Sequence, residues 1–578
     1  MDRNDIDRYA GTSSRSSQKL LVSEAVLRGW DIATTDISKA FLQGVTYEEL
    51  AQLTGEKQRE VNFYLPAADI PLLRQVPGFE DFDPTTEVLH CDKPGTGLVD
   101  APRAFSLKLS RVTAGKCRLA PSKVDPELCC RYDNGRLVCM MTKHVDDLKI
   151  AGEPAVVREI LATLQKEFGE LKISWNDFTN CGVRHLQDPK TKEITLDQIA
   201  YAQQLRKITH SELSTAKNED KCSPELHQLY QSLVGAIAYL AHTRVDALVF
   251  ISALQRHNSS PQIIHVKRAN KLLGWLQHTP KRLAYRALNT GGSHCADPKG
   301  THLRILSDAA FKREGEKGHC LRGALFLRSA STSNFTTSQP VHVLDWVCKG
   351  QRHVARSTFA AELLSAGDAA DHGLLLQQQL HEVVSGPCSA DEARQHRIKG
   401  TFAVPSALYV DAMSVFAAVT ATFVKTPAEK SLLSHVQFLR ELLDRKVVAA
   451  LVWLDTRDMY ADGLTKGAVA RDALHEAMDG RMQINHEAKG WSSKAVDLTS
   501  DMRYTYDFCP QPFFTQLAEA FTALISFAFA MTQDQAKSSK WVPTLERGDG
   551  WSAAKAPPPP PPPPMTAPPA HLAGLGVA

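Results

Sequence analysis

Apolar residues along this chain follow two periods, and the changes between them divide it into regions. Over residues 18–185, short strand-like apolar runs alternate with helical stretches, one of which carries Val157, Leu161 and Leu164 on a single face. This mixture predicts an α+β domain over 18–185. The polar residues before it, 1–17, predict a disordered start.

The pattern changes twice further along the chain. From about 186 to 290, apolar residues recur at three- and four-residue spacing, which predicts a mainly helical region. Over 300–470, strand-like runs come first and then alternate with helical ones, which predicts a mixed sheet with helices packed on it. Beyond about 475 the periodicity is lost and eight consecutive prolines follow, so we expect 475–578 to be a disordered tail.

The composition is sufficient for globular domains, and the net charge limits how the chain could bind nucleic acid. Of the 578 residues 43% are hydrophobic, which is ample for several cores, and 67 lysines and arginines against 64 acids give a net charge of +3. Any nucleic-acid binding must therefore come from local basic patches and not from a global positive field. The twelve cysteines include no CxxC pair, which argues against both a zinc knuckle and a disulfide framework.

Neither end of the chain shows a targeting or membrane segment. The polar N-terminus lacks the apolar core of a signal peptide. The longest apolar segment, 513–531, is interrupted by Gln516 and Glu519 and falls short of a clean membrane span. We therefore expect an intracellular protein, cytoplasmic or nuclear, with no membrane partner.

Two adjacent carboxylates, Asp146 and Asp147, lie between two strand-like runs. Carboxylates about 4 Å apart repel by roughly 4 kcal/mol at an effective dielectric near 20, so they need a cation, a shared proton or open water. A third acid, Asp36, ends another strand-like run. Because side chains alternate faces along a strand, we expect the pair at a tight hairpin turn, with Asp36 and Asp146 binding metal and Asp147 supporting them. The alternative is a solvated turn.

The stretches that contain Asp36 and the pair Asp146 and Asp147, together with acid-containing stretches further along the chain, occur in a familiar order. They resemble the reverse transcriptase and RNase H part of a copia-type LTR-retrotransposon polyprotein. The stretch "TTDISKAFLQG" resembles the first catalytic motif of that family and makes Phe41 the steric gate against a ribose 2′-hydroxyl. The stretch "DKPGTGLVDAPRAF" resembles the following loop and helix and places Arg103 near template or nucleotide. The stretch "HVDDLKIAG" resembles the family's Tyr-Val-Asp-Asp turn, with His144 in place of the tyrosine that packs against the primer end. The family's Thr-Arg-Pro-Asp connection motif corresponds to residues 243–246, with valine at the proline position.

Four separated acids in the third region resemble the Asp-Glu-Asp-Asp set of RNase H. They are Asp308, Glu362, Asp411 and Asp462. The resemblance implies that they bind two magnesium ions and direct water at the RNA strand of an RNA–DNA hybrid, read by its A-form shape. Ala412 stands where the family has asparagine. For any one of these acids taken singly, a surface acid or a helix cap is the alternative.

The resemblance implies a partial polymerase palm over 18–185, a helical thumb or connection over 186–290 and an RNase H-like domain over 300–470. It also implies two Mg²⁺ ions, or Mn²⁺ in their place, at each active site; in the polymerase they would activate the attacking hydroxyl and neutralise the leaving pyrophosphate. The implied partners are an RNA template, a DNA primer, an RNA–DNA hybrid and, if the palm is active, a dNTP. Because only some 35 residues precede Asp36, we expect the fingers region to be missing.

Two functions remain open at this point. The first is a retrotransposon-derived RNA-directed DNA polymerase fragment with an RNase H domain. The second is a degenerate, non-catalytic nucleic-acid-binding remnant, which His144, Ala412 and the missing fingers favour.

Three further features each have a structural and a functional interpretation. His435 lies among apolar residues at helical spacing and is either a packed or surface histidine or a catalytic one. The basic residues Lys267, Arg268 and Lys271 form either a solvated helix face or phosphate contacts. The proline run is either a spacer or a ligand for an SH3- or WW-type domain.

Overall fold

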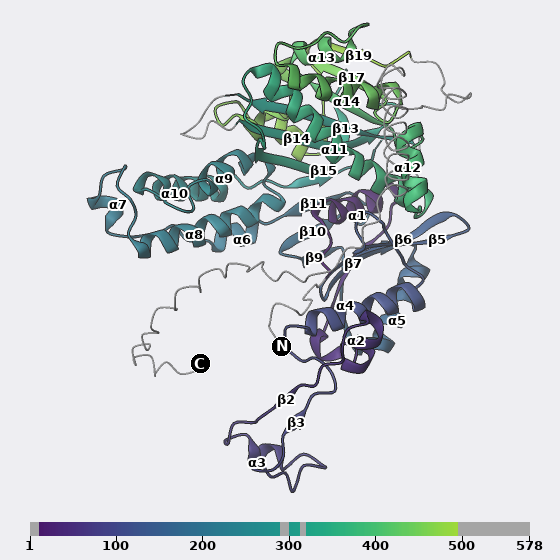
Figure 1. Ribbon diagram of the computed structural model, residues 1–578, viewed down its shortest axis with the longest axis vertical. Coiled ribbons are helices and arrows are strands. Elements are labelled where there is room, and N and C mark those ends of the chain that lie inside the picture. The colour runs from purple at the N-terminus through teal and green to yellow at the C-terminus, as the bar shows by residue number, and fades with distance from the viewer. Residues whose placement is uncertain (1–10, 289–299, 312–319, 495–578) are drawn as a thin grey trace, which may run out of the picture. The chain divides into compact units, whose positions relative to one another are not determined.

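The structure is a computed structural model that describes residues 11–288, 300–311 and 320–494 (Figure 1). Helices and strands are mixed throughout, as the α+β prediction requires. The first helix, α1 (Arg15–Arg28), begins inside the segment expected to be disordered, because Ser14 caps it by accepting from the backbone N–H of Ser17. The proline run and the apolar segment 513–531 lie outside the described residues.

An antiparallel six-stranded sheet forms the core of the N-terminal region, in the order β4-β5-β6-β7-β1-β8. Helices α4 (Ala101–Arg111) and α5 (Pro154–Phe168) pack against it, and the predicted apolar face of α5 is buried against the strands. The strands are β1 (Ile32–Ile37), β4 (Ala120–Pro121), β5 (Leu128–Asp133), β6 (Arg136–His144), β7 (Asp147–Gly152) and β8 (Leu171–Trp175).

The middle region is helical, as expected, but strands flank its helices. A four-stranded sheet in the order β12-β11-β10-β9 joins residues on either side of them. The strands are β9 (Asp177–Asn180), β10 (Val183–Gln187), β11 (Ile194–Asp197) and β12 (Leu283–Tyr285), and the main helices are α8 (Pro224–Tyr239), α9 (Leu248–Gln255) and α10 (Ile263–His278). Lys267, Arg268 and Lys271 are exposed on α10.

A seven-stranded mixed sheet forms the third region, in the order β18-β15-β14-β13-β16-β17-β19. Strands β13, β14 and β15 are antiparallel neighbours, whereas β16 runs parallel to both β13 and β17. The five main strands are β13 (Thr301–Ala310), β14 (Leu321–Ala330), β15 (Gln339–Gly350), β16 (Ser406–Val410) and β17 (Ala450–Leu454).

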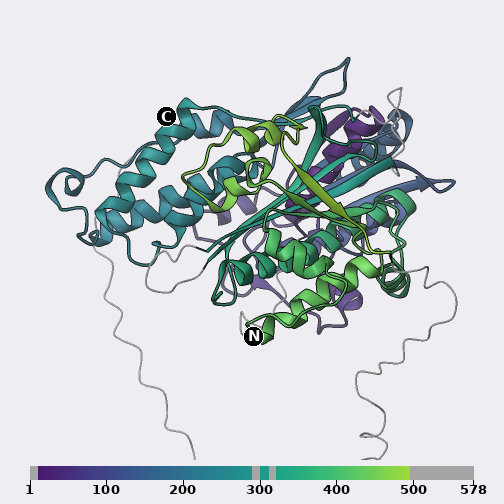
Figure 2. The same ribbon diagram turned by 90° about the horizontal axis from the view of Figure 1, so that it is seen from above.

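Helices cover this sheet as the sequence predicts. Helices α11 (Thr358–Ser385), α13 (Met413–Thr420) and α14 (Leu433–Asp444) pack together, and Figure 2 shows green helices gathered along one face of the strands. Two outer strands, β18 (Arg481–Met482) and β19 (Ala488–Trp491), extend the sheet past residue 475. The first residues of the expected tail therefore belong to the sheet, and 495–578 lie outside the described residues.

Within the described part of the chain, none of the helices combines the length and the hydropathy that crossing a membrane would need. Every cysteine there is a free thiol.

Candidate active sites

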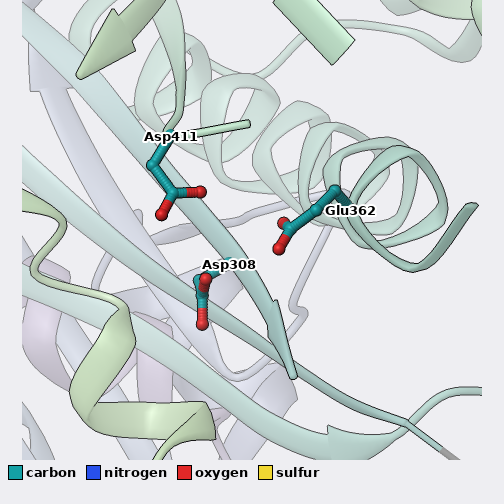
Figure 3. A group of neighbouring side chains, drawn as sticks. All are labelled: Asp308, Glu362 and Asp411. Atoms are coloured by element: carbon teal, nitrogen blue, oxygen red, sulfur yellow. The ribbon is translucent and has the colours of Figure 1, made fainter. Parts of the chain in front are cut away.

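Three carboxylates from three separate elements converge in the third region (Figure 3). Asp308 lies on β13, Glu362 near the start of α11 and Asp411 directly after β16, and one oxygen from each lies within 4.8 Å of the others. Among the residues that the structure describes, this is the one group of three acids, histidines or cysteines so closely gathered.

The strand register explains the convergence of Asp308 and Asp411. Strands β13 and β16 are parallel neighbours with Ser307 opposite Val410, so the next residue of each strand lies at the same level. Helix α11 is held against β13 by Ser365, whose hydroxyl donates to the carbonyl oxygen of Asp308 at 2.8 Å.

The fourth predicted acid, Asp462, comes near this group through a lysine. Asp462 begins the short helix α15 (Asp462–Thr465), and Lys466 follows it directly. The ammonium nitrogen of Lys466 lies 2.7 Å from Asp462 Oδ1 and 3.2 Å from Asp308 Oδ1. The Thr465 hydroxyl donates to the other oxygen of Asp308. The structure thus gathers three of the four acids directly and places the fourth beside them.

A glycine on β14 makes room for α15. Gly323 is paired with Asp308 across the two strands. A Cβ atom at Gly323 would lie 2.6 Å from the Thr465 methyl carbon and 3.0 Å from the Leu464 Cβ. The absent side chain therefore lets α15 approach Asp308 closely enough for the Thr465 and Lys466 contacts.

Burial and mutual repulsion dominate the electrostatics of this site. Burial, followed by the charges of Asp308 and Asp411, raises the pKa of Glu362 to about 9. Burial and the charge of Asp308 raise the pKa of Asp462 to about 7, against the opposing effect of Lys466. Burial and Asp308 also raise the pKa of Asp411. Ionising all of these carboxyl groups together therefore costs free energy unless a bound cation replaces the lost protons.

The donor set fits a hard divalent cation. All three gathered side chains offer carboxylate oxygens, which Mg²⁺ and Mn²⁺ prefer as ligands, and no softer sulfur or imidazole ligand belongs to the group. Buried like charges at this spacing are also the arrangement that a bound cation stabilises.

The acids of the first region are arranged differently. Strands β6 and β7 form a hairpin in which His144 pairs with Asp147, so Val145 and Asp146 form the tight turn that was expected. Val145 adopts φ 60°, a strained conformation for a β-branched residue. Asp36 is exposed on β1 and stands opposite Asp147, whereas the sequence predicts Asp146 as its metal-binding partner.

The two predicted nucleotide-binding residues lie on elements near these acids. Phe41 lies in the short helix η2 (Ala40–Gln43), directly after β1, and packs partly buried against the core beneath α4 and α5. Arg103 lies in the first turn of α4 and forms an ion pair with Glu56 at 3.6 Å.

The structure also gives the surroundings of the connection motif and of His435. Arg244 forms a bidentate ion pair with Asp246, which is fully buried and also accepts from His475 of α16 (Asp472–Met478) at 3.1 Å. These residues therefore fix α16 onto the helical region. His435 lies on α14 at a polar cavity of about 100 Å³ that Arg352 also lines.

Sequence reasoning missed Thr465 and Lys466, although both belong to the stretch "YADGLTK" that identified Asp462. The available signal is the four-residue spacing of Asp462 and Lys466, which places an acid and a base on the same side of a helical turn.

Comparison with curated proteins finds retrotransposon polyproteins. The chain is 24% identical over 479 residues to the retrovirus-related Pol polyprotein from transposon RE2 of Arabidopsis thaliana. It is also 24% identical over 482 residues to the corresponding polyprotein from transposon RE1. Each match covers 79% of this chain, which spans 28% of the length of each relative. No family model matches the sequence. The chain is therefore similar to retrotransposon Pol polyproteins.

Proposed function

We propose that residues 300–470, with strands β18 and β19, form an RNase H-type domain that hydrolyses the RNA strand of an RNA–DNA hybrid. The convergence of Asp308, Glu362 and Asp411 within 4.8 Å of one another carries the proposal. The similarity to retrotransposon Pol polyproteins supports this class of activity. The sequence motifs that contain the four acids, which resemble those of the copia type, support RNase H in particular.

The position of each residue in the site indicates whether it would bind metal or hold a metal ligand in place. Asp308, Glu362 and Asp411 would hold divalent cations, with Asp462 as a further ligand. Bound Mg²⁺ would supply an activated water at neutral pH and neutralise charge on the scissile phosphate. Ser365 and Thr465 fix the main chain and one oxygen of Asp308. Without a cation the carboxylates would repel the phosphates of a hybrid, so substrate binding and metal binding are coupled.

The test is Mg²⁺-dependent cleavage of a labelled RNA–DNA hybrid by the full chain. We expect Asp308→Asn to lower cleavage by about 100-fold or more, since it removes a metal ligand. Asp391→Asn, at an exposed position in the first turn of α12 (Ala390–Lys399), is the matched control and should leave cleavage unchanged. Cleavage that survives Asp308→Asn would place the nuclease elsewhere, and tight hybrid binding without cleavage would favour the non-catalytic remnant.

For residues 18–185 we propose the palm of an RNA-directed DNA polymerase. The opposition of Asp36 and Asp147 beside the hairpin turn at Asp146 supports this proposal. In that role Asp36 and Asp146 would bind metal, with Asp147 supporting them, and Phe41 and Arg103 would contact the nucleotide. The partners would be an RNA template, a DNA primer and a dNTP.

A further inference from the structure

Lys466 supplies a positive charge inside the carboxylate site. Its ammonium group bridges Asp308 Oδ1 at 3.2 Å and Asp462 Oδ1 at 2.7 Å. The Asp308 side chain is fully buried and that of Asp462 is 14% exposed, whereas 32% of the Lys466 side chain is exposed. The lysine therefore enters the site from its solvent side and can leave by the same route.

The charge of Lys466 acts on the whole site. It opposes the effect of burial on the pKa values of Glu362, Asp411 and Asp462. The Lys466 ammonium nitrogen forms ion pairs with both Asp308 and Asp462, and a lysine carries a positive charge at neutral pH. The site thus contains a monovalent cation of its own.

The position of that cation matters for metal binding. A divalent ion that bridged the same two oxygens, at about 2.1 Å from each, would occupy the space of the ammonium group. The oxygens of Glu362 and Asp411 receive no hydrogen bond from Lys466 among the contacts of the described residues. A metal ion between Asp308, Glu362 and Asp411 is therefore compatible with the lysine, and one between Asp308 and Asp462 is not.

We propose that the Lys466 ammonium group is an internal substitute for the second divalent ion. The site then binds one divalent cation at Asp308, Glu362 and Asp411, and a second binds between Asp308 and Asp462 only when Lys466 moves out. This inference rests on the proposed nuclease site and concerns its regulation. Lys466 is a positioning residue that sets the metal content of the site.

The test is a calorimetric titration of the metal-free full chain with Mn²⁺, without hybrid. Subtracting the titration of the Asp308→Asn chain isolates binding at this site from binding elsewhere. We expect the unmodified chain to bind one Mn²⁺ here with a second at least about tenfold weaker, and Lys466→Met to bind two with comparable affinity. Methionine keeps an unbranched side chain and removes the charge.

Two controls separate a charge effect from a loss of structure. Lys466→Arg keeps a cation at the position and should retain the one-ion behaviour, which a merely structural role would not require. Lys489→Met, at an exposed lysine paired with Glu487, should leave the titration unchanged. Circular dichroism before each titration verifies that the variants are folded.

The outcomes distinguish this inference from the nuclease proposal. An unchanged second binding event in a folded Lys466→Met chain would overturn the role of Lys466, whatever the chain does to a hybrid. Absence of Mn²⁺ binding in both chains would overturn the metal site, and with it this inference. If Mn²⁺ binding follows the expected pattern but the chain does not cleave a hybrid, the role of Lys466 is supported and only the nuclease proposal is contradicted.

Discussion

Asp36 and Asp147 stand directly opposite each other on the antiparallel strands β1 and β7. Directly opposed residues share one face of a sheet, with Cβ atoms about 4.5–5.5 Å apart, so their carboxylates repel. Burial, together with the charges of Asp146 and Asp36, raises the pKa of Asp147. Negative charge is thus concentrated where β1 ends and β7 begins, but no third carboxylate among the described residues completes a close group there.

We predict little or no primer extension by the full chain on an RNA template with Mg²⁺ and dNTPs. His144 pairs with Asp147 across the hairpin and offers a smaller, more polar ring than the tyrosine for which it would substitute. His144→Tyr should therefore increase any extension, because a larger aromatic ring packs better against a primer end. The measurement is gel analysis of a labelled primer, with Asp147→Asn as the background. Processive synthesis by the unmodified chain would contradict this prediction.

Local patterns predicted the elements of this chain well where packing follows the sequence period. The apolar face of α5, with Val157, Leu161 and Leu164, is buried as expected because a helix that covers a sheet must bury one stripe. The mixed sheet over 300–470 was also predicted, since its strands alternate with helices in the sequence. Asp308, Glu362 and Asp411 could be identified because each belongs to a stretch that resembles a motif of the RNase H family.

Contacts between distant segments could not be predicted in the same way. Strands β18 and β19 are short and have no apolar period, and only pairing with β15 and β17 makes them strands. The opposition of Asp36 to Asp147 depends on the register of two strands more than a hundred residues apart. The contact of Lys466 with Asp308 needs the close approach of α15 over Gly323, which no local pattern contains.

Glu24 and Arg328 form a fully buried ion pair at 2.5 Å between α1 and β14. Arg28 also donates to Glu24 at 2.8 Å. Replacing Glu24 with Gln should destabilise the fold by about 3–5 kcal/mol, because it leaves the Arg328 charge buried without a counter-ion. The urea-unfolding midpoint measures this loss. Glu487→Gln, at a side chain that is 66% exposed, is the matched control and should change the free energy of unfolding by less than about 0.5 kcal/mol.

The same ion pair predicts an acid-sensitive part of the stability. Despite the opposing effect of burial, Arg328 and Arg28 lower the pKa of Glu24 to about 2 from its ordinary value near 4.5. A lowered folded-state pKa stabilises the fold fully above the unfolded value, and the stabilisation is lost as pH falls from about 4.5 to 2. We expect the unfolding midpoints of the unmodified and Glu24→Gln chains to converge over that window. A constant difference down to pH 2 would show that the Glu24 charge is not its source.

Gly323 offers a steric test of the α15 position. In Gly323→Ala the new methyl group would lie 2.6 Å from the Thr465 methyl carbon, so α15 must move and the Thr465 and Lys466 contacts with Asp308 weaken. We expect hybrid cleavage to fall by about tenfold or more, consistent with the sensitivity of catalysis to displacements of about 1 Å. Gly350→Ala, at a strand position with open space around its Cβ, is the matched control. Equal cleavage by the two variants would show that α15 is not needed at its present position.

The titration of Glu362 should make the stability of the metal-free fold depend on pH with the opposite sign to the effect of Glu24. Burial and the neighbouring acids Asp308 and Asp411 raise the pKa of Glu362 to about 9. A carboxyl group with a raised folded-state pKa binds more protons in the folded state, so the metal-free fold loses stability as pH rises from about 4.5 towards 9. Glu362→Gln removes the titrating group and should make the unfolding midpoint in EDTA less dependent on pH over that range.

Divalent metal should reverse this effect in the unmodified chain. A bound Mg²⁺ replaces the proton on Glu362 and stabilises the ionised carboxylates, so the midpoint should rise with pH in excess Mg²⁺ instead of falling. The Glu362→Gln chain lacks that ligand and should gain less from Mg²⁺. Glu441→Gln, at a side chain that is 53% exposed on α14, should respond like the unmodified chain. Equal Mg²⁺ stabilisation of all three chains at pH 8 would mean that Glu362 is not a metal ligand, because only a group in contact with the cation links metal binding to its own titration.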